Sequence, residues 1–371
     1  MTTFDAVVIG GGLVGAALSF GLTGHGLTVA MLDEGDTALR ASRGNFGLVW
    51  VQGKGLGRPE YARWSRRSAG NWSDFATELT DLTDIDIGFS RPGGLLVALT
   101  ENELAGYVEM LEALRSEAGN DGYEFELLDH RALSELLPGI GAMIPGATYC
   151  PYDGHANPLH LLHALHAGFI ARGGRYYAEY AAKGIEAHNG GFRIHTETRV
   201  FEGARVVIAA GLGSATLGTT IGLTIPVVPL QGQLMVTERS APRFELPTNL
   251  VRQTNEGSFL LGYSQEDLGF DTDTDAPTLR DIAWRCIRAF PFLADLRVVR
   301  AWGALRIMTP DGFPVYAQSA SHPGAFAVTC HSGVTLAANH ALDVSKWIAA
   351  GSIPDAYGCF GLERFDVSPA A

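Results

Sequence analysis

The chain has 371 residues and a formal net charge of 27 − 40 = −13, from 27 Lys and Arg and 40 Asp and Glu. Hydrophobic residues make up 46% and charged residues 18%, a globular composition that excludes a disordered chain. The acidic balance argues against a nucleic-acid or anionic-membrane partner, because either would need a basic face. The 46 glycines exceed average usage, so we ask whether they gather where the backbone must approach a ligand.

The first apolar segment, residues 6–22, has the length of a signal peptide but not its flanks. No Lys or Arg precedes it, and five glycines interrupt it. No other segment has 18 uninterrupted apolar residues, and the four cysteines form no CxxC pair. We therefore expect a cytoplasmic protein with reduced thiols and without a membrane span, a disulfide framework or a zinc site.

This segment carries a glycine motif between a strand and a helix. A Val- and Ile-rich strand, residues 4–9, runs into Gly10, Gly12 and Gly15 in a GxGxxG pattern, and an apolar helix follows over 13–22. Gly10 permits the tight turn, Gly12 lets the backbone approach a pyrophosphate, and Gly15 lets the helix pack on the strand. The phosphates would lie at the helix N-terminus, which includes Leu13 and Val14.

A second strand, residues 27–32, completes the motif. It ends at Asp33 and Glu34, and Asp33 can accept hydrogen bonds from both hydroxyls of a ribose. A lone GxGxxG is weak, but the two strands, the helix and the acid together predict a dinucleotide site.

The rest of the chain alternates helices and strands. Helices are predicted at residues 59–82, 101–118, 159–171 and 276–290, and from Gly333 to residue 350. Strands are predicted at 94–99, 175–180, 204–210, 297–305 and 325–329, with a meander over 183–209 that turns at Asn189-Gly190 and short strands over 225–263. The length suggests about two domains, but no linker marks a boundary.

Three later segments sharpen this picture. Residues 205–211 form a strand that ends in glycine, residues 153–159 are followed by Gly173-Gly174, and residues 303–314 precede His331-Ser332-Gly333-Val334. In this order, and with the first glycine motif, they resemble the FAD-dependent D-amino-acid oxidase superfamily over nearly the whole chain. The resemblance is to its glycine oxidase and sarcosine oxidase branch, and the chain is similar to the flavin subunits of opine oxidase and hydrogen cyanide synthase.

The resemblance implies an α/β plus α+β fold with non-covalently bound FAD. A Rossmann-like FAD-binding domain would be discontinuous, over residues 1–85, 144–213 and 300–371. An inserted antiparallel-sheet substrate domain would comprise residues 86–143 and 214–299. The resemblance also implies which residues lie along the cofactor: Ser42, Arg43, Asn45, Phe46, Gly47, Ala182, Ala210, Gly211, Arg306, Ser332, Gly333, Val334 and Thr335.

The family reaction oxidises a C–N bond of an amino acid by hydride transfer to the flavin, and the imine product is then hydrolysed. Arg306 matches the arginine that pairs with the substrate carboxylate, and a guanidinium fork suits that task. A structural ion pair is the alternative for Arg306. His331 falls where the reacting edge of the flavin is expected, as a substrate contact, a stabiliser of the reduced ring or a packing residue.

The sequence departs from the family at several positions. Gln231 stands where relatives often have Lys or Arg, and the substrate tyrosine of some relatives falls near Leu250. Arg252 could take over anion binding there. No Lys occurs over residues 325–345, so the lysine with which sarcosine oxidases activate oxygen has no match in that segment. This favours a dehydrogenase that passes its electrons elsewhere.

Other interpretations stay open. His160, His163 and His166 lie three apart on a predicted helix and could bind a metal, although the family segment explains the helix as structural. Trp64 and Trp72 are predicted to be core residues. Three functions remain: an amino-acid oxidase or dehydrogenase with a small-molecule substrate, a flavin subunit that relays electrons to partner chains, and an NAD-dependent dehydrogenase. Partner subunits or a homo-oligomer are both possible.

Overall fold

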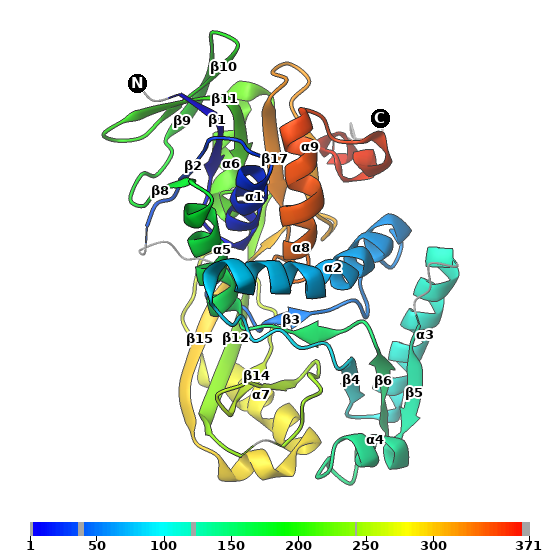
Figure 1. Cartoon of the computed structure of the whole chain (residues 1–371). Coiled ribbons are helices and arrows are strands. Elements are labelled where there is room, and N and C mark those ends of the chain that lie inside the picture. Colours follow the sequence, from blue (N-terminus) through cyan, green and yellow to red (C-terminus); the bar gives the residue numbers. More distant parts are fainter. Residues whose placement is uncertain (1–2, 36–40, 120–123, 242, 366–371) are drawn as a thin grey trace.

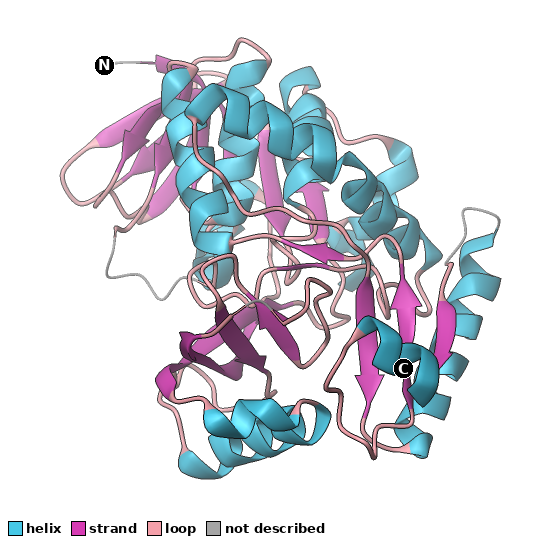
Figure 2. Cartoon of the chain, turned by 60° about the horizontal axis from the view of Figure 1, so that its bottom comes forward, coloured by secondary structure: helices cyan, strands magenta, loops and turns pink. Residues whose placement is uncertain are grey.

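A computed structural model describes residues 3–35, 41–119, 124–241 and 243–365. One part of the molecule is built on a large, mostly parallel sheet with helices, at the top of Figure 1. The other part holds smaller antiparallel sheets with helices of their own, at the bottom of Figure 1. Figure 2 shows the same two groups of strands from another side. The fold is therefore the predicted α/β plus α+β combination.

The large sheet has the strand order β16-β17-β11-β1-β2-β8. β1 pairs in parallel with β2 and with β11, so that Ile9 lies between Leu32 and Ile208. The strands are β1 (Thr3–Ile9), β2 (Val29–Leu32), β8 (Arg175–Tyr177), β9 (Gly184–His188), β10 (Gly191–His195), β11 (Val200–Ile208), β16 (Val315–Gln318) and β17 (Ala325–Thr329). Because β1, β2 and β11 run in the same direction, the loops after them meet at one edge of the sheet.

Helices cover one face of this sheet. α1 (Leu13–Gly24) packs against α5 (Pro158–Ala171) and against the C-terminal helices α8 (Ala337–Asn339) and α9 (Ser345–Ala350), with α2 (Pro59–Thr83) across them. A Cβ atom at Gly21 would stand 2.1 Å from the carbonyl oxygen of Ala341, so glycine permits this close approach of two helices. Trp64 and Trp72 are buried in this layer, as predicted.

The small sheets use residues far apart in the chain. One has the order β13-β14-β12-β15, and the other has the order β4-β6-β5. Their strands are β4 (Gly94–Ala98), β5 (Glu126–Asp129), β6 (Gly146–Cys150), β12 (Val228–Arg239), β13 (Val251–Gln253), β14 (Ser258–Gly262) and β15 (Val298–Met308). The helices of this part are α3 (Glu101–Ala118), α4 (His130–Leu136) and α7 (Ala276–Ala289). The predicted boundary at residue 144 would separate β6 from β4 and β5, with which it pairs.

Most predicted elements are present, with shifted ends. Asn189 and Gly190 have φ values of 49° and 78° and form the predicted turn between β9 and β10. The predicted strand 175–180 ends at Tyr177, and the strand predicted over 297–305 continues to Met308 and therefore includes Arg306.

The start of the last helix differs from the prediction. The helix predicted from Gly333 begins instead at Ala337, and it contains a π-helical segment, His340–Val344, before α9. The turn that precedes it is held by other parts of the chain, because Thr335 Oγ1 donates to the carbonyl of Leu48 and accepts a hydrogen bond from the backbone N–H of Trp50.

Candidate active site

A cavity of ≈ 680 Å³, which we call the glycine-loop cavity, lies where β1, β2 and β11 end. Its lining brings together residues that are far apart in the sequence: Gly10, Gly11, Gly12, Leu13, Val14, Asp33, Glu34, Ala41, Ser42, Ala182, Ala210, Gly211, Leu305 and Cys330. Ten of the twenty residues predicted to contact the cofactor therefore share one cavity.

The backbone of this cavity is built with little room for side chains. Gly10 has a φ of 110°, and a Cβ atom there would stand 2.3 Å from the carbonyl oxygen of Ala209. A Cβ atom at Gly15 would stand 1.9 Å from the carbonyl oxygen of Gly10. α1 begins at this point, and Gly12 provides no side-chain cap, so the positive end of the helix dipole faces the cavity. This cradle fits the pyrophosphate of a dinucleotide.

Asp33 is buried and holds the loop in place. Its carboxylate accepts hydrogen bonds from the backbone N–H of Gly11 (2.5 Å) and of Gly35 (2.8 Å). Ser42 adds a further link, because its hydroxyl accepts from the backbone N–H of Leu13 at 2.9 Å. The sequence predicts Asp33 as a ribose contact. The structure shows a second role, because Asp33 also holds the backbone of the glycine loop through Gly11.

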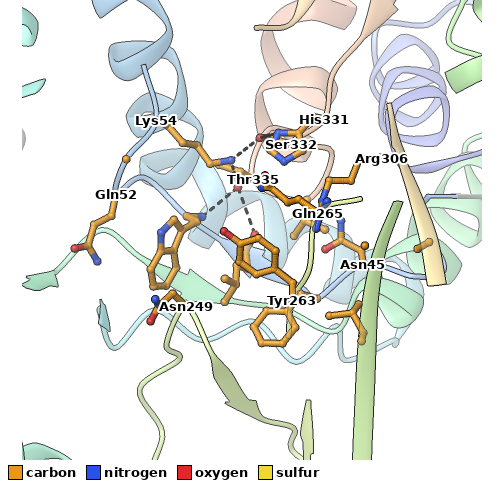
Figure 3. Close-up of a pocket in the computed structure, with 18 of the residues that line it drawn as sticks. Asn45, Gln52, Lys54, Asn249, Tyr263, Gln265, Arg306, His331, Ser332 and Thr335 are labelled. Carbon is orange, nitrogen blue, oxygen red and sulfur yellow. Dashed lines mark hydrogen bonds between the residues drawn. The ribbon is translucent and has the colours of Figure 1, made fainter. Parts of the chain in front are cut away.

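A second cavity of ≈ 470 Å³, which we call the Arg306 cavity, shares Ala41 and Leu305 with the glycine-loop cavity. Figure 3 shows its polar residues. Seven predicted site residues line it: Asn45, Phe46, Arg306, His331, Ser332, Val334 and Thr335. The remaining lining includes Trp50, Gln52, Lys54, Tyr107, Asn249, Tyr263 and Gln265, together with apolar residues such as Leu48, Leu96 and Met110.

Arg306 is held by the backbone of the antiparallel sheet. Its guanidinium donates to the carbonyl of Gln231 (3.2 Å) and to the carbonyl of Ser264 (2.7 Å), and it lies 5.2 Å from the ring centroid of Tyr263. Within the described ranges no carboxylate comes within ion-pair distance of Arg306; Glu266 acts on it only from farther away. Burial lowers the pKa of Arg306, and the group remains a cation at neutral pH.

Lys54 is the second cation of this cavity, and no sequence motif marks it. Its Nζ donates to Ser332 Oγ at 2.5 Å and lies 3.4 Å from Thr335 Oγ1. Desolvation lowers the pKa of Lys54 to about 8, against the opposing influence of Cys330 and Asp153. Lys54 comes from the loop after β3 (Leu48–Val49), far from residues 325–345, where the family comparison places the lysine. Residues 325–345 contain no lysine, and the lysine of this cavity comes instead from another segment of the chain.

His331 lines the Arg306 cavity and is accessible from it. Its Nδ1 lies 3.1 Å from Ser332 Oγ. Desolvation by the surrounding protein, together with the cations Lys54 and Arg306, lowers the pKa of His331 to about 3. The imidazole is therefore neutral at physiological pH and can act as a hydrogen-bond donor or acceptor, but not as a cation.

Arg252 is not in the Arg306 cavity. It lines a neighbouring cavity of ≈ 420 Å³ with Arg43 and Arg300. Its Nε donates to the carbonyl of Phe46 at 2.8 Å, and its Nη1 lies 3.3 Å from His155 Nδ1. Arg252 thus holds the segment of Asn45, Phe46 and Gly47 through the carbonyl of Phe46, from the side of the neighbouring cavity.

Within the Arg306 cavity, Tyr263 lies beside Arg306. Leu250 is buried outside the Arg306 cavity, whereas Tyr263 follows the end of β14. Gln231, where relatives often have a cation, is fully buried and donates to the carbonyl of Asp273 at 2.7 Å. The pairing of β12 with both β14 and β15 brings Tyr263 to Arg306, so no local signal in the sequence indicates it.

Two of the three histidines of α5 lie against different backbone carbonyls. His166 Nε2 lies 2.8 Å from the carbonyl oxygen of Gly11, and His160 Nδ1 lies 2.9 Å from the carbonyl oxygen of Asp86. Within residues 3–35, 41–119, 124–241 and 243–365, no cluster of three His, Cys, Asp or Glu has the arrangement of a metal site. In the same ranges, no helix has the length and apolar character needed to cross a bilayer.

Known proteins are similar to this chain in both sequence and fold. The family model described as FAD dependent oxidoreductase matches residues 5–347. An opine oxidase subunit of Agrobacterium tumefaciens (strain Ach5) is 41% identical over 370 residues, and its namesake in Rhizobium meliloti is 40% identical; both alignments cover 100% of each chain. The crystal structure of glycine oxidase from Geobacillus kaustophilus matches with a TM-score of 0.86 and 23% identity, over 100% of both chains.

Proposed function

The chain belongs to the FAD-dependent oxidoreductase family, and on that premise we propose that it oxidises the C–N bond of a small N-substituted amino acid of the opine type. Membership of this family identifies the cofactor as FAD rather than NAD. The name of the two relatives at 41% and 40% identity supports an opine-like substrate over glycine.

The two cavities fit the two halves of FAD. The glycine-loop cavity offers a helix N-terminus and a close backbone to the pyrophosphate, with Asp33 on the ribose side. The Arg306 cavity continues from it through Ala41 and Leu305 and would receive the flavin along Asn45 and Phe46. When bound, FAD supplies the acceptor for the hydride that leaves the substrate carbon. Cys330 lines the glycine-loop cavity, and burial raises its pKa to about 12, which supports non-covalent binding.

The environment of Arg306 is the observation that supports the proposal most strongly. Its guanidinium faces the cavity, is oriented by two backbone carbonyls, and has no carboxylate at ion-pair distance among the described residues. A partly buried cation with no carboxylate at ion-pair distance is costly, and the carboxylate of an amino-acid substrate would supply a direct partner. Tyr263 lies against Arg306 and can donate a hydrogen bond to the same carboxylate.

The remaining polar residues suit an amine that must be neutral before its C–N bond is oxidised. Neutral His331 and Asn249 can accept hydrogen bonds from an amine without adding positive charge beside it. Their task is alignment, since a fixed geometry contributes more to such a reaction than a strong base. Water then hydrolyses the imine product to a carbonyl compound and an amine.

An anaerobic screen tests this function. The FAD-loaded protein is mixed with amino acids, N-alkyl amino acids and N-(carboxyalkyl) amino acids, and the flavin absorbance is followed. We expect N-substituted amino acids to bleach the flavin faster than glycine does. A purified protein without flavin absorbance, or a flavin that no amine reduces, would contradict the proposal.

A second candidate is a flavin subunit that passes electrons to partner chains. It is favoured by the relatives at 41% and 40% identity, since both are named as subunits of an opine oxidase. The native mass of the purified chain and its turnover with oxygen separate the two candidates. A stable monomer or homodimer with full oxidase activity would exclude the subunit role.

A further inference from the structure

We propose that Phe270 is a cofactor-binding residue that covers FAD in the glycine-loop cavity, and that two buried glutamines, Gln231 and Gln233, position the loop that carries it. We call residues 264–275, which lie between β14 and α7, the Phe270 loop. The inference concerns the cofactor alone, so it goes beyond the proposed function and does not depend on the substrate.

The first support is the place of Phe270. The Phe270 loop leaves the antiparallel sheet at the end of β14, yet Phe270 lines the glycine-loop cavity together with Leu305 and Ile307 of β15. A turn places it there, since the backbone N–H of Asp271 donates to the carbonyl of Leu268 at 3.3 Å. An aromatic side chain from one part of the molecule therefore reaches the cofactor cavity of the other part.

The second support is the exposure of Phe270, whose side chain is 67% exposed. Leu268 is 54% exposed as well, but it lines none of the three cavities, so the position of Phe270 on a cavity distinguishes the two residues. Leu212, Leu217 and Leu305 extend the apolar lining from Phe270 along the same cavity. FAD bound there would remove part of the phenyl ring from water, which is favourable.

The third support is the way the Phe270 loop is held. Gln231 and Gln233 are fully buried on β12, although glutamine is mostly an exposed residue. Gln231 exchanges backbone hydrogen bonds with Glu266 (2.9 and 3.0 Å), and its side chain donates to the carbonyl of Asp273 (2.7 Å). Gln233 Nε2 donates to Glu266 Oε1 (3.0 Å) and to Asp275 Oδ2 (2.7 Å). Both ends of the loop are therefore tied to one strand.

The Phe270 loop also packs directly on β15. A Cβ atom at Gly303 would stand 2.6 Å from the carbonyl oxygen of Thr272, so glycine permits this approach. Gly303, Leu305 and Ile307 alternate along β15 and therefore share one face of the strand. The loop follows this face from Thr272 to Phe270, which lies at the cavity.

The beginning of the same loop serves the Arg306 cavity. The carbonyl of Ser264 accepts a hydrogen bond from Arg306 (2.7 Å), and Gln265 lines that cavity beside Arg306, as Figure 3 shows. One loop thus contacts both cavities, and the two glutamines that hold it are positioning residues.

The test of Phe270 measures how fast the holoenzyme releases FAD, from the rise in flavin fluorescence after dilution. Phe270→Ala should release FAD about tenfold faster or more, the scale of a phenyl contact that is lost to water. Phe270→Tyr keeps the ring and should release FAD at close to the wild-type rate. Leu268→Ala is the matched control, because it shortens another exposed apolar side chain of the same loop, and it should leave the rate unchanged.

A double-mutant cycle tests the role of the glutamines. Gln233→Met removes the hydrogen bonds to Glu266 and Asp275, so it should speed FAD release by about threefold or more. The same change should add little to Phe270→Ala, because Gln233 acts on FAD through Phe270. Ser264→Ala removes the bond from the backbone N–H of Gln233 to Ser264 Oγ (2.8 Å) and completes the cycle if Gln233→Met does not fold.

Release of FAD from Phe270→Ala at the wild-type rate would overturn the inference. An equal acceleration in Leu268→Ala would also overturn it, since the effect would then belong to the loop in general. Additive effects of Gln233→Met and Phe270→Ala would reject the positioning role of the glutamines. Because no measurement uses a substrate, a flavin that no amine reduces would contradict the proposed function and leave this inference standing.

Discussion

The glycine-loop cavity and the Arg306 cavity are neighbours built in opposite ways. The first is made mainly of backbone: Gly10, Gly12 and Gly15 shape a turn at the end of a parallel strand. The second is made of side chains from several elements, with Arg306 on an antiparallel strand and Lys54 on a loop more than two hundred residues away in the sequence.

This difference suggests that the backbone determines binding of the cofactor, which the whole family shares, whereas side chains determine which substrate binds. A cavity made of backbone tolerates few changes, because an added Cβ atom meets other backbone atoms that cannot move aside. A cavity made of side chains can change its ligand by changing one residue. We therefore expect substitutions in the first cavity to remove FAD, and substitutions of Arg306 or Tyr263 in the second to change substrate binding while FAD stays bound.

The largest effect is expected at Gly15. A Cβ atom there would stand 1.9 Å from the carbonyl oxygen of Gly10, so Gly15→Ala should cost about 3 kcal/mol of folding free energy and release FAD. Flavin absorbance after gel filtration and thermal unfolding measure both effects.

The control for Gly15→Ala is Gly70→Ala. Gly70 lies within α2, where an added Cβ atom meets nothing within 4 Å, so the substitution should be neutral or stabilise by up to about 1 kcal/mol. A Gly15→Ala protein that keeps its flavin would show that the loop is not the rigid cradle described.

The next effect is expected at Arg306. Arg306→Met should raise the Michaelis constant for a carboxylate substrate by tens-fold or more, the scale of a lost buried charge pair of roughly 2–5 kcal/mol, without loss of FAD. Arg300→Met is the control, because Arg300 is an exposed residue on the same strand. An unchanged Michaelis constant in Arg306→Met, measured by steady-state kinetics, would reject the role of Arg306.

The smallest effect is expected at Tyr263. Tyr263→Phe keeps a ring beside Arg306 and removes only the hydroxyl, so the Michaelis constant should rise by about three- to tenfold, the scale of one neutral hydrogen bond. Tyr152→Phe is the control, since the hydroxyl of Tyr152 accepts from Arg66 and donates to Glu124, outside the Arg306 cavity. Equal effects of the two changes would remove Tyr263 from the site.

The same contrast explains what can be predicted from the sequence. The βαβ unit from Thr3 to Leu32 follows from local periodicity and from glycines whose spacing has one physical explanation, so its elements and the acid Asp33 are predictable. Arg306 and the Ser332–Thr335 turn follow only from resemblance to a family. Lys54 and Tyr263 carry no local signal, because the pairing of β12 with β14 and β15 and the packing of the loop after β3 decide their place.

Anaerobic titration of the FAD-loaded protein with iminodiacetate, in wild type and in Arg306→Met, tests the central claim most directly. We expect the wild-type flavin to be fully bleached with release of glyoxylate and glycine, and the Arg306→Met flavin to remain oxidised at the same concentration. A wild-type flavin that stays oxidised with every N-substituted amino acid, or equal bleaching of both proteins, would contradict the assignment of this cavity as an amino-acid oxidation site.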